Sequence, residues 1–116
     1  MKNRALKEDI APLKTYLQEL IESKVPSFHK KRQRWNETLT GLAVVIKFQP
    51  LEHEISPAAV CSGIKDVEGR LLSESTVRTQ LQVMMGRGLL RKVSHGPVKR
   101  PTSYLISFEI PGDVLA

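Results

Sequence analysis

Residues 73–93 read SESTVRTQLQVMMGRGLLRKV and decide the fold. Ser73 is suited to cap the N-terminus of a helix, and Val77, Leu81 and Met84 recur at the spacing of one helical face. The Gly86-Arg87-Gly88 segment is typical of a helix end, and the apolar residues that follow it favour a strand. The stretch therefore predicts a capped amphipathic helix that leads directly into a strand.

A β-hairpin is expected after this helix. Its strands are predicted at 89–94 and 102–110. In the second strand one side carries Tyr104, Ile106, Phe108 and Ile110, and the other side carries Ser103, Ser107 and Glu109. The turn between them, residues 95–101, reads HGPVKRP and carries cations between two prolines. Because proline restricts the backbone, this turn is expected to be a stiff basic tip.

The segment before Ser73 is expected to hold a buried helix and a short one. The first begins at Asn36 or Thr38 and is apolar around most of its circumference, which is typical of a helix at the centre of a domain; its apolar residues are Leu39, Leu42, Ala43, Val45, Ile46 and Phe48. A very short strand is predicted at Glu54-Ile55. Ser56 then caps a helix from Pro57 to about Ser62 that ends at Gly63, and 64–72 is expected to be a loop.

An amphipathic helix is predicted at the N-terminus, from Asp9 to Lys24. Asp9 is its expected cap, and Pro12 falls in the first turn, where its missing N–H costs nothing. Residues 27–36 are basic and show no clean periodicity, so they are expected to form a link. The predicted organisation is an N-terminal helix with a basic linker at 1–35 and a main domain at 36–112.

The composition indicates a small cytoplasmic protein with an anionic partner. Eighteen Lys and Arg face twelve Asp and Glu, which gives a net charge of +6 and a pI near 9.7. The alternative is that this charge has no binding role and only keeps the chain soluble. Cys61 is the single cysteine, so neither an internal disulfide nor a cysteine-based zinc site is expected, and no apolar run is long enough to span a membrane.

The sequence gives little support for a catalytic site. The histidines are scattered, Cys61 has no base near it in sequence, and no glycine-rich loop precedes a helix at the spacing that a nucleotide requires. Glu52, His53 and Glu54 are interpreted as solvated charge on a turn. We therefore expect no enzyme activity, no cofactor, no metal and no small-molecule ligand.

The predicted order of elements resembles the winged helix-turn-helix family of DNA-binding domains, of the MarR-like kind. The resemblance covers about residues 36–110 and is carried by four segments in order, which are 56–60 (SPAAV), 75–81 (STVRTQL), 87–91 (RGLLR) and 100–106 (RPTSYLI). It implies a mainly α fold with a small β-hairpin, an α+β class, with an extra N-terminal helix in this chain. The connection at 63–72 departs from the family, because helix-turn-helix units usually join their helices by three or four residues. Either the preceding helix runs further, or the turn is expanded.

The resemblance assigns the outward face of the 73–86 helix to DNA bases and the basic hairpin to the phosphate backbone. Hydroxyl, amide and guanidinium groups can read base edges in a major groove; the expected base-contacting residues are Ser75, Thr76, Arg78, Thr79 and Gln82. The expected backbone contacts are Arg87, Arg91, Lys99 and Arg100, with Lys30, Lys31 and Arg32 as further candidates. The alternatives are that the polar helix face is merely exposed to solvent and that the hairpin is an ordinary soluble one, with no role in binding DNA.

The N-terminal helix has two readings. Its apolar stripe, formed by Ile10, Leu13, Leu17 and Leu20, can build a homodimer interface, since winged-helix regulators generally read two-fold sites as dimers. Alternatively the stripe packs back on its own domain, and the basic run after it is a solvated linker.

The expected function is sequence-specific binding of double-stranded DNA by a dimeric transcriptional regulator or a plasmid or phage DNA-binding factor, located in the cytoplasm and on the nucleoid if the source is bacterial. The alternative is a winged-helix module that binds protein within a larger complex. The long connection at 63–72 and the moderate charge favour that alternative.

Overall fold

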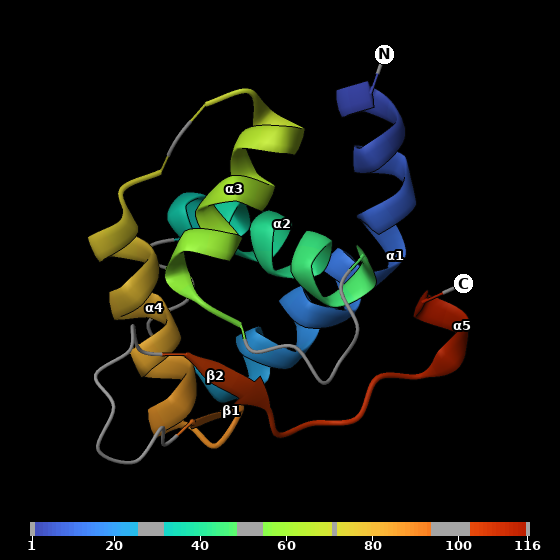
Figure 1. Ribbon diagram of the computed structural model, residues 1–116. Coiled ribbons are helices and arrows are strands. Elements are labelled where there is room, and N and C mark those ends of the chain that lie inside the picture. The colour runs from blue at the N-terminus through green and yellow to red at the C-terminus, as the bar shows by residue number, and fades with distance from the viewer. Residues whose placement is uncertain (1, 26–31, 49–54, 71, 94–102, 116) are drawn as a thin grey trace.

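The computed structural model describes residues 2–25, 32–48, 55–70, 72–93 and 103–115. These residues are mainly helical, with one small antiparallel sheet, so the α+β class is confirmed. The elements follow in the order α1 (Lys2–Lys24), α2 (Arg32–Phe48), α3 (Pro57–Glu68), α4 (Glu74–Gly86), β1 (Leu90–Lys92), β2 (Tyr104–Ile106) and α5 (Gly112–Leu115). Figure 1 shows α1 and α4 on opposite sides of the molecule, with α2 and α3 between them.

The helix α1 begins earlier than its sequence pattern predicts. It starts at Lys2, so Asp9 is not its cap and Pro12 lies in the helix interior. A proline there removes one backbone hydrogen bond and crowds the preceding turn. The Asp9 carbonyl in that turn accepts a hydrogen bond from Lys47 Nζ at 2.7 Å, which ties the turn to the C-terminal end of α2.

The apolar stripe of α1 lies in the core of this same chain. Ile10, Leu13 and Leu17 are 0–1% exposed and Leu20 is partly buried against the core. These are the residues that the sequence suggested for a dimer interface. A second copy cannot cover side chains that are already buried, so the reading in which the stripe packs on its own domain is the one observed.

The helix α2 occupies the centre of the molecule, as predicted. It packs against α1, α3 and α4, and Leu39, Leu42 and Ala43 are fully buried. Two details of the prediction are wrong. The helix starts at Arg32 rather than at Asn36 or Thr38, which places Trp35 inside it and in the core, and Phe48 at its C-terminal end is 49% exposed.

The helix α3 runs six residues beyond its predicted end. Ser56 caps it as predicted, since its side chain accepts a hydrogen bond from the Ala59 N–H at 3.2 Å. Gly63 does not stop it, because the stripe continues through the buried Ile64 and Val67. The helix ends at Gly69, whose φ of 74° is in the left-handed region that favours glycine. Only residues 69–73 therefore separate α3 from α4.

Glycines allow α2 and α3 to cross at close range. A Cβ built on Gly63 would lie 2.9 Å from the Gly41 carbonyl oxygen and 3.1 Å from the Gly41 Cα. A Cβ on Gly41 would overlap the Val60 carbonyl in the same way. The backbones meet directly at this crossing, so it fixes the position of α3 relative to the central helix.

The sheet is shorter than predicted but has the predicted antiparallel pairing. Leu90 pairs with Ile106 and Lys92 with Tyr104. The short strand predicted at Glu54-Ile55 is represented by a bridge, in which Ile55 and Tyr104 exchange two backbone hydrogen bonds of 2.7 and 2.8 Å. The chain then crosses to α1, where Tyr16 Oη donates to the Glu109 carbonyl at 2.6 Å, and ends in the short helix α5, which the sequence did not predict.

Candidate functional site

The helix α4 is amphipathic, and its inner face is fixed by both apolar and polar contacts. Val77, Leu81 and Met84 are fully buried, as predicted. Between them lies Gln80, which is 6% exposed and whose side-chain oxygen accepts a short hydrogen bond from the Thr38 hydroxyl of α2. A buried amide that loses this partner would be costly, so the bond favours one rotation of α4 about its own axis. This pair was not predicted from the sequence.

The outer face of α4 carries the residues expected to contact bases. Ser75, Arg78, Thr79 and Gln82 are exposed and Thr76 is partly exposed. Figure 1 shows this helix at the left edge of the molecule, with one side free of other labelled elements. The structure therefore brings these five residues together on one accessible surface.

Local hydrogen bonds order part of this surface. The Thr79 hydroxyl donates to the Ser75 carbonyl at 2.9 Å, and the Ser73 and Ser75 hydroxyls lie 3.0 Å apart. Ser73 sits at the N-cap position, but its side chain makes no capping bond to the helix backbone, so that part of the prediction is wrong. The first N–H groups of α4 receive no bond from the Ser73 side chain.

Arg78 pairs with a carboxylate that was not predicted to be its partner. Its guanidinium donates to Glu74 Oε1 at 3.0 Å, one helical turn away, and the two side chains are 46% and 53% exposed. A pair this exposed is worth about 0.3–0.5 kcal/mol, so Arg78 stays available to another partner.

The structure describes only some of the residues that are expected to contact the DNA phosphate backbone. Arg87 follows α4 and Arg91 lies on β1, and both are exposed, as is the neighbouring Lys92. Lys30, Lys31, Lys99 and Arg100 lie outside the described residues, and so does the side chain of Arg32. The four described cations at this end of the molecule are Arg78, Arg87, Arg91 and Lys92.

The charge of the chain is distributed unevenly. Residues 75–108 contain six of the eighteen cations and none of the twelve carboxylates. The remainder, which includes Glu74 at the start of α4, holds twelve of each and is formally neutral. Residues 74–108, which include all of α4 and both strands, therefore carry +5 of the net charge of +6. Glu68, at the C-terminal end of α3, lies close enough to Lys14 of α1 to influence its pKa.

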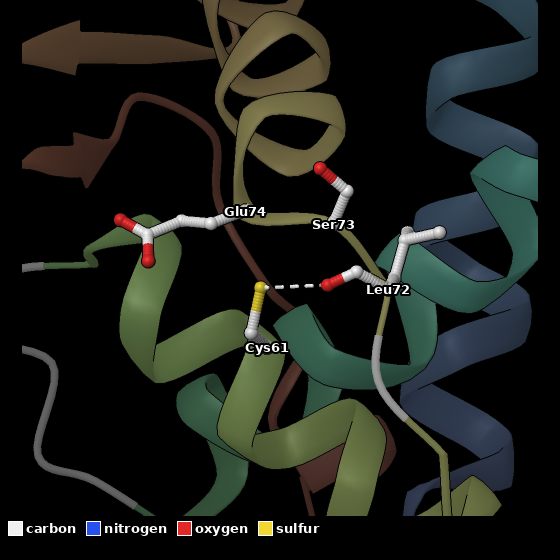
Figure 2. Close-up of a pocket in the computed structure, with 4 residues that line it drawn as sticks. All are labelled: Cys61, Leu72, Ser73 and Glu74. Carbon is white, nitrogen blue, oxygen red and sulfur yellow. Dashed lines mark hydrogen bonds between the residues drawn. The ribbon is translucent and has the colours of Figure 1, made fainter.

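A cavity opens between α3 and the first turn of α4, lined by Cys61, Leu72, Ser73 and Glu74 (Figure 2). The Cys61 thiol lies 3.4 Å from the Leu72 carbonyl and donates to it. Burial, and to a smaller extent the charge of Glu74, raises the pKa of this thiol. A protonated and hydrogen-bonded thiol is a poor nucleophile, so we assign Cys61 a structural role at the α3–α4 connection.

Metal and membrane features are not found in the described part of the chain. No group of three or more His, Cys, Asp or Glu side chains there is arranged to hold a metal ion. None of its helices combines the length and the apolar character needed to cross a bilayer.

Comparisons with protein-family models, with curated proteins and with solved structures found no match to this chain.

Proposed function

We propose that this protein is a winged-helix protein that binds double-stranded DNA, with the outer face of α4 in the major groove. The order of α2, the Ile55 bridge, α3, α4 and the two strands supports the winged-helix assignment. The five-residue connection between α3 and α4 supports it further, because the expected ten-residue departure from the family is absent.

One observation carries the proposal. The accessible polar face of α4 belongs to a segment, residues 74–108, that holds +5 of the chain's net charge of +6. Hydroxyl and amide groups can bond to base edges, and flanking cations can neutralise phosphates on either side of the groove. A merely soluble surface requires no such separation of charge, since mixed charges serve solubility equally well.

The direct test measures binding of random-sequence duplex DNA by fluorescence anisotropy over a range of salt concentrations. Each neutralised phosphate contributes about 0.9 to the slope of log K against log salt, so phosphate contacts by Arg87, Arg91 and Lys92 contribute about 2.7 to the slope. Arg87→Ala and Arg91→Ala are each expected to lower the slope by about 1.

The matched control is Lys7→Ala, which removes one cation from the exposed surface of α1 on the other side of the molecule. Its slope is expected to equal that of the wild type. If Lys7→Ala lowers the slope as much as Arg91→Ala does, binding is a property of overall charge and the proposed site is wrong. If the wild type shows no affinity for duplex at low salt, the DNA-binding proposal itself is wrong, and the protein-binding alternative gains support.

Homodimer formation remains part of the proposal, although not through the buried α1 stripe. Sedimentation of the protein with and without duplex measures the stoichiometry. Two chains per site are expected for a palindromic target, with half-sites one helical turn apart.

A further inference from the structure

Glu74 is an unusual residue for a surface that binds a polyanion. It is the only acidic residue of α4 and the last carboxylate before Glu109. It lies in the first turn of the helix, where a phosphate would otherwise be favoured by the helix dipole and by backbone N–H groups that the Ser73 side chain does not cap. Its charge repels a phosphate from that position. Under the proposed function, this end of α4 must therefore meet something other than the DNA backbone.

The geometry of Glu74 and Arg78 suits a base pair. The residues are four apart, so their side chains lie on one face of the helix, about 6 Å apart along its axis. Their charged groups meet at 3.0 Å, and both side chains are about half exposed. They present a hydrogen-bond acceptor directly beside a set of donors, and solvent reaches both.

In the major groove a C·G pair offers the complementary arrangement. Cytosine N4 is a donor that a Glu carboxylate can accept from, and guanine O6 and N7 are acceptors for a bidentate Arg. The N-terminal residues of the recognition helix are those that reach base edges in helix-turn-helix proteins. Resting on the proposed function, we propose that Glu74 and Arg78 act together as the specificity-determining residues for a C·G base pair in the target site.

The pairing also explains why a carboxylate is tolerated on this surface. The exposed Glu74 contact weakly biases the Arg78 guanidinium toward this position before binding, so somewhat less side-chain freedom is lost when the base is contacted. A cytosine amino group then satisfies the carboxylate in the groove. With guanine or thymine at that position, Glu74 would face an acceptor or an apolar methyl group and would oppose binding. Adenine would offer its N6 donor to Glu74, but its thymine partner lacks the paired O6 and N7 acceptors that a bidentate Arg78 requires.

The experiment is a binding-site selection from random duplex, carried out with the wild type, Glu74→Gln, Arg78→Lys and the control Glu19→Gln. The control removes the same charge from the exposed surface of α1. Circular dichroism verifies that each variant is folded. Anisotropy with the selected site and with single-base changes at the C·G pair then gives the discrimination of each variant.

The wild type and Glu19→Gln are expected to select the same site with one fixed C·G pair. Glu74→Gln should lose about tenfold in discrimination for that pair while its affinity for random duplex rises, because a repelling charge is gone. Arg78→Lys keeps the charge but not the bidentate geometry, so it should lose the guanine preference with an unchanged salt slope.

Two results overturn this inference without overturning DNA binding. In one, Glu74→Gln selects the same C·G pair as the wild type, which would leave Glu74 with only its helix-stabilising role. In the other, the wild type binds duplex with a steep salt dependence but selects no sequence. Absence of any duplex binding would instead remove the proposed function, and this inference with it.

Discussion

At the scale of single residues, Gly63 shows that a glycine can mark either the end of a helix or a close crossing of two helices. In sequence it is typical of a helix end, yet it lies inside α3 at the point where Gly41 of α2 approaches. The sequence around Gly63 could not reveal this crossing, because the backbone that requires a glycine there belongs to a different helix, α2. The buried bond between Thr38 and Gln80 escaped prediction for the same reason, since the partners are 42 residues apart.

Gly63→Ala is expected to destabilise the protein by about 1–3 kcal/mol, even though alanine favours helix, because the new Cβ would press on the Gly41 backbone. Gly86→Ala is the matched control. No atom lies within 4 Å of a Cβ built there, so it should be neutral or stabilising by up to about 1 kcal/mol. Urea denaturation measures both, and equal effects would contradict the close crossing.

At the scale of elements, the periodic parts of the sequence were predictable and the boundaries were not. The buried faces of α2 and α4 follow from residues such as Leu42 and Leu81, whose spacing alone defines a stripe. The start of α2 at Arg32 was missed because residues 32–34 are charged and polar and show no apolar repeat. Of the candidate site, the exposed face of α4 follows from the same spacing, whereas the Glu74–Arg78 pair was overlooked although the i,i+4 rule could have found it.

The packing of α1 predicts the effect of truncating its stripe. Leu17→Ala should lower the free energy of unfolding by about 2–5 kcal/mol, because Leu17 is fully buried and leaves a cavity. The loss should be independent of protein concentration in urea denaturation. A stably folded variant that changes only its oligomeric state would restore the dimer-interface reading of this helix.

Lys14, also on α1, gives a pH-dependent prediction. Burial lowers its pKa from the ordinary value of 10.5; Glu68 opposes this shift and Lys7 adds to it. The folded state therefore disfavours the charged form, and stability rises with pH as Lys14 loses its proton, reaching full relief above 10.5. Lys14→Met should be more stable than the wild type at pH 7, and the difference should shrink as pH approaches 10.5, as followed by thermal unfolding between pH 7 and 10.5.

At the scale of the whole molecule, the division predicted at residue 35 does not coincide with a break in the core. One hydrophobic cluster contains Leu13 and Ile21 of α1 together with Leu39 of α2 and Leu81 of α4. The N-terminal helix and the later elements share this core, so they are expected to unfold together. A sequence shows a change of composition at 27–36, but it does not show that the chain on both sides packs on one centre.

Two independent probes test this expectation. Trp35 is 2% exposed and reports on the core near the start of α2, whereas far-ultraviolet circular dichroism reports on all helices. Their urea transitions should coincide, as in a two-state domain. Loss of helical signal before the change in Trp35 fluorescence would show that α1 detaches first and is a separate unit.

The one-sided charge described above also makes the molecule an electric dipole. The described cations at the α4 end, Arg78, Arg87, Arg91 and Lys92, outnumber Glu74 beside them, so an approaching polyanion would attract this end more strongly and would turn the protein before contact is made. Productive orientations then become more frequent among random encounters, and association is accelerated. Dissolved ions screen this interaction beyond roughly 8 Å at physiological ionic strength. The salt concentration should therefore control the association rate as well as the affinity.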